Sequence, residues 1–197
     1  YSTIKDTMLL FDGLKPSTEY AFRLRGVNKD GHSDWIEFKA TTKNNPLEFA
    51  ITGIVGKTSV ANEEGTDVDK LFDFDETDMW HTKWGTKAVP FDLVMDLRTI
   101  NQLDKLHYLP RTGRGNGILL KGTVYYSNNQ EDWNDAGTFD WANNDATKVF
   151  NFDKHPAARY IKLSITDGVG NFGSGRELYV FKVPGTESLL PGDINND

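Results

Sequence analysis

Short runs in which apolar residues recur at every second position constrain the fold of this chain more than any other feature. Phe91, Leu93, Met95 and Leu97 show this pattern most clearly, and a period of two is that of a β-strand with one buried face. Similar runs lie at 20–25, 122–126, 160–165 and 178–183, and turn pairs such as Asp167-Gly168 and Pro184-Gly185 separate them. A short helical turn is expected only within 60–70. The pattern predicts an all-β sandwich.

Composition narrows the classes of partner. Of 197 residues, 38% are hydrophobic and 12% aromatic, which suffices for one sizeable core. The 29 acidic residues outnumber the 22 basic ones, for a net charge of −7, so we expect neither nucleic acid nor a membrane surface as partner. The chain has no cysteine, which excludes thiolate metal sites and disulfides. No apolar run reaches the roughly 20 residues of a membrane span.

The chain divides into four segments. A first piece covers 1–42, a polar breaker stretch at 43–46 is a predicted linker, and the main domain covers 47–183. The remaining segment, 184–197, is a predicted second linker with the beginning of another module. Tyr1 is no initiator residue, so we expect an internal piece of a larger protein.

The first piece contains the run Leu14-Lys-Pro-Ser-Thr-Glu-Tyr20. This run resembles the tyrosine corner of fibronectin type III domains, in which a phenol hydroxyl pins the chain as it enters a strand. The resemblance covers only half of that fold, and about 42 residues cannot bury both faces of a sandwich. We expect a partial fibronectin type III domain that is frayed, completed by another molecule or missing its first strands.

The last residues, Pro191-Gly-Asp-Ile-Asn-Asn-Asp197, resemble the opening of a dockerin calcium loop. Asp193, Asn195 and Asp197 would be its first three ligands, but the glycine and the closing carboxylate of such a loop are absent. We therefore expect no tight calcium binding at the tail. A complete dockerin would imply a cohesin partner, and an ordinary acidic linker is the alternative interpretation.

Several residues of the main domain suit recognition of a sugar. Galactose exposes a patch of C–H bonds that packs on an aromatic ring, and its hydroxyls need strong donors. His81 and Trp84 lie three residues apart, Arg111 and Asn116 flank a glycine-rich loop, and Phe172 stands in a loop of small polar residues. A large aromatic in such a loop is expected to be exposed and to mark a recognition site.

Each of these residues also has an ordinary structural explanation. His81 could be a core histidine, Trp84 could fill a loop cluster, and Arg111 could pair with a surface carboxylate. Asn116 between two glycines could be a turn residue. From the residues alone these alternatives stay open.

Motifs along the main domain resemble those of discoidin-like (F5/8 type C) domains, and among them most closely carbohydrate-binding module family 32. The motifs are Asp73-Phe-Asp-Glu-Thr-Asp-Met-Trp-His-Thr82, Phe91–Leu97 after Pro90, Tyr108-Leu-Pro-Arg111 with Gly115-Asn-Gly117, Tyr125–Trp133, Arg159–Leu163 and Glu177–Phe181. The resemblance implies a discoidin-like jelly-roll sandwich that binds terminal galactose or N-acetylgalactosamine of host glycans. It further implies that His81, Arg111 and Asn116 donate to sugar hydroxyls, Phe172 stacks on the sugar and Trp84 forms a second wall.

The same resemblance implies a structural calcium ion. Its ligands would be the side chains of Asp73, Asp75, Asp78 and Glu177 and the backbone carbonyls of Lys70 and Arg176, an all-oxygen set that suits this cation. Phe74 stands where the family usually has glycine and Asp78 where it often has threonine. A solvated acidic loop is the alternative.

The implied protein is a secreted, non-catalytic module that directs a glycoside hydrolase in the same polypeptide to glycans. Two other classes stay open: a glycosidase fragment using two carboxylates, and a discoidin domain that binds protein or lipid. We find no recognisable catalytic motif, and the acidic composition disfavours lipid.

Overall fold

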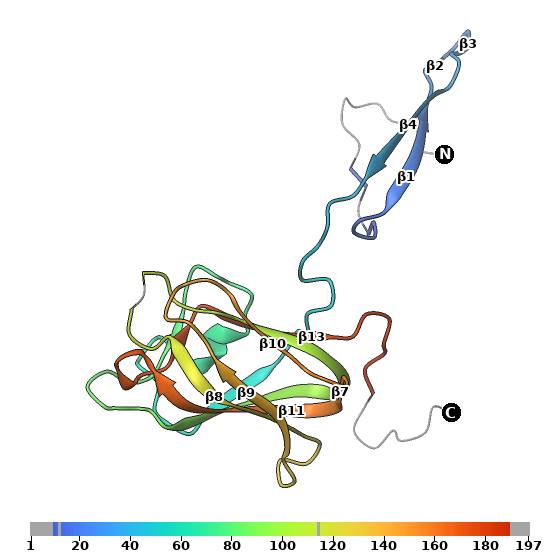
Figure 1. Cartoon of the computed structure of the whole chain (residues 1–197). Coiled ribbons are helices and arrows are strands. Elements are labelled where there is room, and N and C mark those ends of the chain that lie inside the picture. The colour runs from blue at the N-terminus through green and yellow to red at the C-terminus, as the bar shows by residue number, and fades with distance from the viewer. Residues whose placement is uncertain (1–9, 12, 114, 190–197) are drawn as a thin grey trace. The chain divides into compact units, whose positions relative to one another are not determined.

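A computed structural model describes residues 10–11, 13–113 and 115–189. Its described residues form two compact units, one ending at Glu48 and one beginning at Phe49 (Figure 1). Each unit is described by itself below.

The first unit is a pair of antiparallel ribbons. Its strands are β1 (Glu19–Leu24), β2 (Val27–Asn28), β3 (Gly31–His32) and β4 (Ile36–Thr41). Phe22 of β1 pairs with Phe38 of β4, and their rings stack with centroids 5.3 Å apart. The hydroxyl of Tyr20 accepts a hydrogen bond from the backbone N–H of Lys15 at 2.9 Å, which is the kind of contact expected of a tyrosine corner.

One face of this ribbon is apolar and largely exposed, although the ring of Phe11 packs on Phe22 with centroids 5.1 Å apart. Leu24 and Ile36 pair across the strands on the same face as Phe22 and Phe38, yet Ile36 is 66% and Phe38 50% exposed. An antiparallel ribbon with one bare apolar face is what half of a sandwich would leave. The assignment to fibronectin type III remains a prediction.

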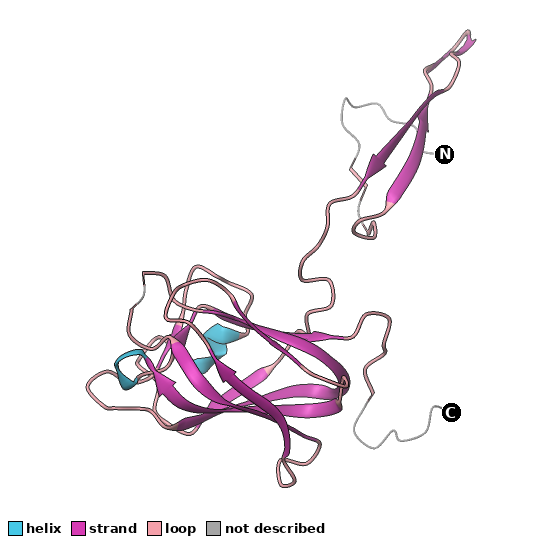
Figure 2. Ribbon diagram, viewed as in Figure 1, coloured by secondary structure: helices cyan, strands magenta, loops and turns pink. Residues whose placement is uncertain are grey.

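The second unit is a β-sandwich, in which long strands dominate (Figure 2). Its strands are β5 (Val55–Thr58), β6 (Trp80–His81), β7 (Phe91–Leu109), β8 (Leu119–Ser127), β9 (Asn134–Asp140), β10 (Lys148–Asn151), β11 (Ala157–Gly168), β12 (Ser174–Gly175) and β13 (Glu177–Lys182). The helical elements in the described residues are two 3₁₀ turns, η1 (Val68–Leu71) and η2 (Val169–Asn171). The predicted all-β fold is confirmed.

Strand β7 belongs to both layers of the sandwich. Its first half pairs with β5 and β11, and the sheet continues through β8 to β9. Its second half pairs with β10 and β13. Between the halves Arg98 has φ 68°, a left-handed conformation that redirects the strand. The second half of β7 therefore runs back to the end of the sandwich where β7 begins, and the loop that carries Arg111 follows there.

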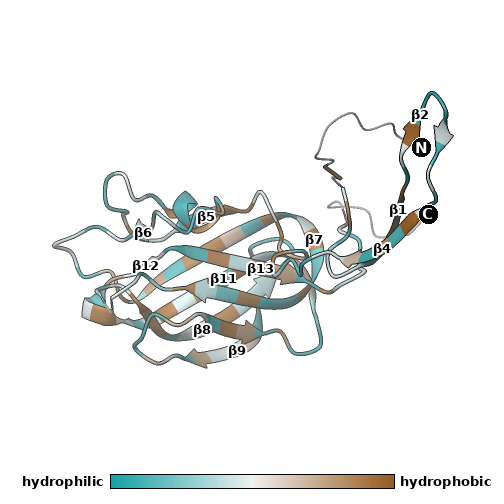
Figure 3. Cartoon of the chain, turned by 90° about the horizontal axis from the view of Figure 1, so that it is seen from above, coloured by the Kyte–Doolittle hydropathy of each residue, from teal (hydrophilic) through white to brown (hydrophobic). Residues whose placement is uncertain are grey.

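The core lies between these layers and follows the alternation of the sequence. Leu93, Met95 and Leu163 are fully buried, while their neighbours along the strands point outward. Figure 3 shows this as hydrophobic and hydrophilic residues alternating along β7 and β11. Burial of these side chains contributes about 1.5–3 kcal/mol each.

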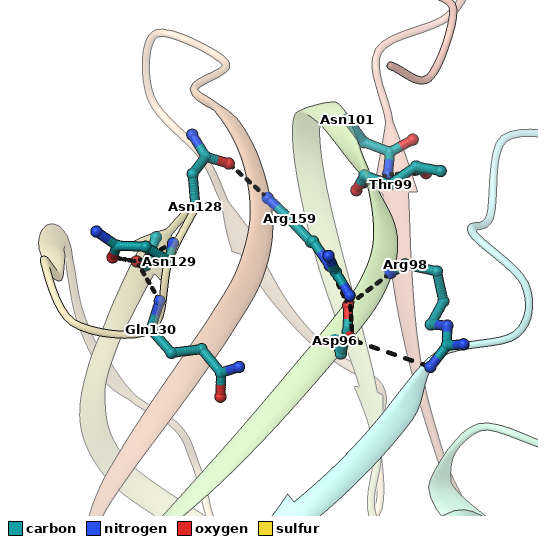
Figure 4. A network of polar contacts seen from close by, with 9 residues as sticks. Asp96, Arg98, Thr99, Asn101, Asn128, Asn129, Gln130 and Arg159 are labelled. Atoms are coloured by element: carbon teal, nitrogen blue, oxygen red, sulfur yellow. Dashed lines mark hydrogen bonds and ion pairs between the residues drawn. The ribbon is translucent and has the colours of Figure 1, made fainter. Parts of the chain in front are cut away.

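A polar network braces the end of the sandwich where β7 turns (Figure 4). The Arg159 guanidinium donates two hydrogen bonds to the Asp96 carboxylate, at 2.8 and 2.9 Å. Asn128 accepts the backbone N–H of Arg159 at 3.0 Å. Hydrogen bonding to Arg159 lowers the pKa of Asp96.

Residues 184–189 lie along the sandwich. The backbone groups of Leu189 and Ile100 exchange two hydrogen bonds, each of 2.8 Å, and the Ser188 hydroxyl donates to Asn101. The predicted start of a dockerin at 191–197 lies outside the described residues. Among the described residues, no helix is long and apolar enough to span a membrane.

Candidate functional site

A short pairing of β6 with β12 joins two stretches that lie far apart in the sequence. His81 pairs with Ser174 and Trp80 with Gly175, and the two strands lie side by side in Figure 3. The backbone of Gly173 extends this pairing, since its carbonyl accepts the N–H of Thr82 at 2.8 Å. His81 and Phe172 therefore reach the same end of the sandwich.

Gly173 makes this close approach possible. A Cβ atom there would lie 2.4 Å from Cζ of Phe91 and 2.7 Å from Cη2 of Trp80. Both neighbours are buried rings that have no space to move into. The requirement for glycine thus follows from packing against the core.

A third stretch, 116–118, is joined to the other two by backbone hydrogen bonds. The N–H of Gly117 donates to Val169 at 2.7 Å, and the Gly117 carbonyl accepts the N–H of Ser174, also at 2.7 Å. The Ser174 hydroxyl donates to the carbonyl of Asn116 at 3.1 Å. The loops that carry Arg111, Asn116 and Phe172 are therefore held together.

Three aromatic rings meet at this end. The imidazole of His81 stacks on the indole of Trp84, with ring centroids 3.8 Å apart and an interplanar angle of 24°. The phenyl ring of Phe172 lies 5.5 Å from His81 and 5.2 Å from Trp84, tilted to both. Trp84 is 43% exposed and Phe172 is half-buried. Phe172 is thus less exposed than its loop of small polar residues suggested, because these two rings pack against it.

His81 is fully buried, and its hydrogen bond defines its tautomer. Nδ1 lies against the carbonyl of Thr82, so Nδ1 carries the proton and Nε2 presents a lone pair. Nε2 has no hydrogen-bond partner among the described residues. Burial lowers the pKa of His81, the Thr82 carbonyl opposes this, and the Arg111 charge lowers it further. The imidazole is therefore neutral at neutral pH, with Nε2 as an acceptor.

Arg111 and Asn116 complete the group. Nη1 of Arg111 donates to the Asn116 carbonyl at 3.4 Å, while the buried Nε has no partner among the described residues. A Cβ atom on Gly115 would lie 2.7 Å from that Nε, so the glycine makes room for the guanidinium. Asn116 is exposed, and its side chain adjoins Gly170. All five residues predicted to bind sugar thus lie together.

Glu63 is a member of this site that the sequence reasoning missed. Its carboxylate accepts the backbone N–H of Trp84 at 2.8 Å, and its own N–H donates to the carbonyl of His81 at 2.9 Å. Glu63 therefore positions both residues. Its side chain stands in a plain acidic stretch with no motif, and its role arises from a contact across 21 positions.

The predicted metal loop folds back on the start of β13. The ammonium of Lys70 pairs with the carboxylates of Asp78 and Asp73, the latter at 3.4 Å. The Asp75 carboxylate accepts the hydroxyl and the N–H of Thr77, at 2.6 and 2.9 Å, and these bonds lower the pKa of Asp75. The Asp75 side chain is thus engaged in its own turn.

Glu177 is the unusual group of this loop. It is fully buried, and neither carboxylate oxygen has a hydrogen-bond partner among the described residues, nor does Oδ1 of Asp78. Burial, with the nearby carboxylate of Asp73, raises the pKa of Glu177 to about 8. Buried oxygens without donors are what a cation would satisfy, so these residues fit calcium chemically.

Side chains alone do not complete such a site. Within the described ranges, no group of three or more histidine, aspartate or glutamate side chains is arranged to hold a metal ion. A calcium ion would thus need backbone carbonyls, as expected for Lys70 and Arg176. The side chain of Arg176 points elsewhere, donating from Nε to the carbonyl of Pro110 at 3.1 Å.

Phe74 has an unusual backbone conformation for a residue with a side chain. Its φ of 65° is the left-handed conformation that favours glycine, at a cost of about 1 kcal/mol for a residue with a side chain. Its ring packs on Tyr179 with centroids 5.2 Å apart, which offsets part of this cost. The turn therefore accommodates a phenyl side chain.

Comparison with solved structures places this sandwich among carbohydrate-binding modules. The family 32 module of Clostridium perfringens NanJ, in complex with galactose, is 30% identical over 68% of this chain and 98% of that chain, with a TM-score of 0.62. A C. perfringens CBM32-5 module in complex with GalNAc-β-1,3-galactose is 25% identical over 67% and 99%, with a TM-score of 0.63. A further C. perfringens module, CBM32-1 from a family 31 glycoside hydrolase, is similar in fold at 21% identity, over 70% and 100%, with a TM-score of 0.64.

These similarities confirm the predicted discoidin-like sandwich. The similar structures are carbohydrate-binding modules. The family described as F5/8 type C domain matches residues 55–178. That range includes strands β5 to β12 and every residue predicted to contact sugar. The chain belongs to the F5/8 type C domain family.

Proposed function

We propose that the unit from Phe49 is a non-catalytic module that binds terminal galactose or N-acetylgalactosamine. The observation that supports this most directly is the meeting of His81, Arg111 and Phe172 at one end of the sandwich. Two modules of similar fold and at least 25% identity are described as complexes with galactose-containing sugars.

The chemistry of His81 and Arg111 suits a single sugar hydroxyl that contacts both side chains. Nε2 of neutral His81 accepts a hydrogen bond, and the Arg111 guanidinium donates one. A hydroxyl both donates and accepts, so a single hydroxyl satisfies both groups. The partly exposed rings of Trp84 and Phe172 suit the C–H patch of galactose. Our expectation from the sequence that His81 donates is thereby revised, since its proton is already engaged by Thr82.

Titration calorimetry with free sugars tests the proposal. One ring stack and a few hydrogen bonds correspond to about −4 to −6 kcal/mol, or an affinity from tens of micromolar to millimolar. Galactose and N-acetylgalactosamine are expected to bind in that range, and glucose, which differs from galactose only at the hydroxyl of carbon 4, more weakly. Binding of all three with equal affinity, or of none, would contradict the proposal.

Galactose affinity should depend on pH through His81. Because burial lowers the pKa of this residue, the imidazole stays neutral down to a pH below the ordinary histidine value of about 6.5. Affinity is expected to be constant from pH 8 to 6.5 and to fall at lower pH. Protonation there removes the Nε2 lone pair and places a second positive charge beside Arg111, which outweighs the attraction of Glu63. Calorimetry across this range measures the midpoint; a midpoint above 6.5 would show that another group controls binding.

We further propose that a calcium ion stabilises the loop before β6. Glu177 and Asp78 would supply carboxylate oxygens, and Lys70 and Arg176 backbone carbonyls. Asp73 and Asp75, also expected as ligands from the sequence, are instead engaged by Lys70 and Thr77. The support is the set of buried carboxylate oxygens without donors at Glu177 and Asp78. Calcium would supply the positive charge that lets Glu177 stay ionised inside the protein.

Calcium should raise the melting temperature of this unit. At ten times its dissociation constant a bound ion contributes about 1.4 kcal/mol, which corresponds to a few degrees. The Glu177→Gln variant is expected to show no calcium response, because it keeps the shape and loses the charge. In chelator it should be at least as stable as the wild type, since it removes an unpaired buried carboxylate. An equal calcium shift in both proteins, measured by tryptophan fluorescence, would rule Glu177 out as a ligand.

The context of the module is proposed from the same likenesses. We propose that it is secreted and that it directs an attached glycoside hydrolase to glycans, as one similar module comes from a family 31 glycoside hydrolase. A cohesin partner would require the complete dockerin that the residues at 191–197 resemble.

A further inference from the structure

One buried hydroxyl lies where the stretches that carry the proposed sugar contacts meet. Tyr108 is fully buried and stands on β7 three residues before Arg111. Its hydroxyl donates to the carbonyl of Ser174 at 2.5 Å and accepts the backbone N–H of Leu119 at 3.2 Å. Ser174 and Leu119 are also fully buried. The phenol thus uses its donor and one of its acceptor positions on backbone groups of two other stretches.

Each of these two stretches leads directly to predicted sugar contacts. Ser174 follows Phe172 by two residues and pairs with His81 across the short strands β12 and β6. Leu119 follows Asn116 by three residues and begins β8. The single hydroxyl therefore connects the stretch with Phe172 and its partner strand to the stretch with Asn116, and both to the end of β7.

The ring that carries this hydroxyl is tightly packed. A Cβ atom on Gly175 would lie 2.6 Å from Cε2 of Tyr108 and 2.8 Å from Cδ2 of Leu71. The indole of Trp141 stacks on Tyr108 with ring centroids 5.6 Å apart. The space of one hydroxyl oxygen is smaller than a water molecule needs. Without the hydroxyl, the two backbone groups would lose a buried partner, and the stretches that carry them would shift to find others.

We propose that Tyr108 is a positioning residue for sugar binding: its hydroxyl fixes the spacing between the stretches that carry Phe172 and Asn116. This inference rests on the proposed function and deepens it, because it identifies what aligns the sugar contacts with one another. Tyr108 acts only through its neighbours, since a fully buried side chain does not touch a glycan. Hydrogen bonds weaken steeply when their geometry is disturbed, so a small shift of these stretches weakens several sugar contacts together.

Tyr108→Phe tests this inference, and Tyr179→Phe is its matched control. Each change removes one hydroxyl from a buried tyrosine, and the Tyr179 hydroxyl donates to Glu76 of the predicted metal loop at 3.0 Å. Titration with galactose followed by amide NMR signals measures the affinity of folded molecules alone. Tyr108→Phe is expected to bind at least about fivefold more weakly than the wild type, because two buried groups lose their partner, and Tyr179→Phe as well as the wild type. Wild-type affinity in Tyr108→Phe, or an equal loss in both variants, overturns the proposal.

The same spectra report the arrangement of the stretches without any sugar. In Tyr108→Phe, the Leu119 amide is expected to exchange with solvent at least about tenfold faster than in the wild type, because local opening becomes easier. The amide signals of Asn116 and Phe172 should shift in this variant and keep their wild-type positions in Tyr179→Phe. Signals of Asn116 and Phe172 that do not move in Tyr108→Phe overturn the proposal, because the hydroxyl then does not set their arrangement.

If Tyr108→Phe does not fold, the wild type decides. Galactose is then expected to shift the amide signals of Leu119 and Ser174, since the junction is connected to the sugar contacts, and signals that stay in place overturn the proposal.

The two proposals fail in different ways. If the wild type does not bind galactose, the proposed function fails, and the sugar-free signals of Asn116 and Phe172 still decide whether Tyr108 arranges these stretches. If galactose binds the wild type and Tyr108→Phe equally well, the positioning role fails and the function stands.

Discussion

Replacing Arg111 by alanine is expected to weaken galactose binding by at least about tenfold. A hydrogen bond from a charged group contributes about 1.5–3 kcal/mol, and 1.4 kcal/mol corresponds to a factor of ten in affinity. Melting should change little, because the guanidinium makes one long hydrogen bond, of 3.4 Å, to Asn116. Calorimetry on both proteins measures the difference.

Arg98→Ala is the matched control for this prediction. This variant removes the same chemical group at the corner of β7, where the Arg98 guanidinium lies 4.0 Å from the Asp96 carboxylate and the Arg98 side chain is 61% exposed (Figure 4). The Arg98→Ala protein should bind galactose with the affinity of the wild type. Arg111→Lys should be intermediate, since lysine keeps the charge but loses the planar fork. Wild-type affinity in Arg111→Ala would place the guanidinium outside the sugar site.

The largest loss of stability is expected for Trp80→Ala. Trp80 is fully buried, its indole meets Phe91 edge-on at 6.0 Å, and its Nε1–H donates to Asn62 at 2.8 Å. Removing a buried tryptophan costs about 3–5 kcal/mol. Because β6 carries His81 next to Trp80, galactose binding should be lost with it. Urea unfolding gives the free energy of unfolding, and calorimetry gives the affinity.

Trp133→Ala controls for loss of an indole at a less buried place. Trp133 is half-exposed, donates to the Gln130 carbonyl at 3.0 Å and has the Lys162 ammonium 4.5 Å from its ring centre. We expect a loss of roughly 1 kcal/mol or less and unchanged galactose affinity. If Trp80→Ala costs no more than Trp133→Ala, the packing of β6 on the core contributes less than its burial indicates.

The fold was predictable from the sequence because its signal is local. The alternation of Phe91, Leu93 and Met95 specifies a strand with one buried face, whatever the strand pairs with. What the alternation could not show is that β7 continues through Arg98 into a second sheet. That continuation depends on a single left-handed residue and on partners more than forty positions away.

The sequence predicted which residues lie together, but not how they are arranged. The motifs pointed to His81, Trp84, Arg111, Asn116 and Phe172, and the structure brings all five to one end of the sandwich; their contact with sugar stays a prediction. No motif identified Glu63, because its role is a hydrogen bond to the backbone of another loop. Nor did the residues show that Phe74 has a left-handed backbone while its ring packs on Tyr179.

The sequence by itself determined the strand pattern, the acidic loop and the kinds of side chain available for a sugar. The tertiary structure alone decided that His81 is buried beneath Trp84 with its proton engaged by Thr82. The reason is physical: alternation and side-chain type are properties of neighbouring residues. Burial, tautomer and accessibility depend on the pairing of His81 with Ser174 and on the close packing at Gly173.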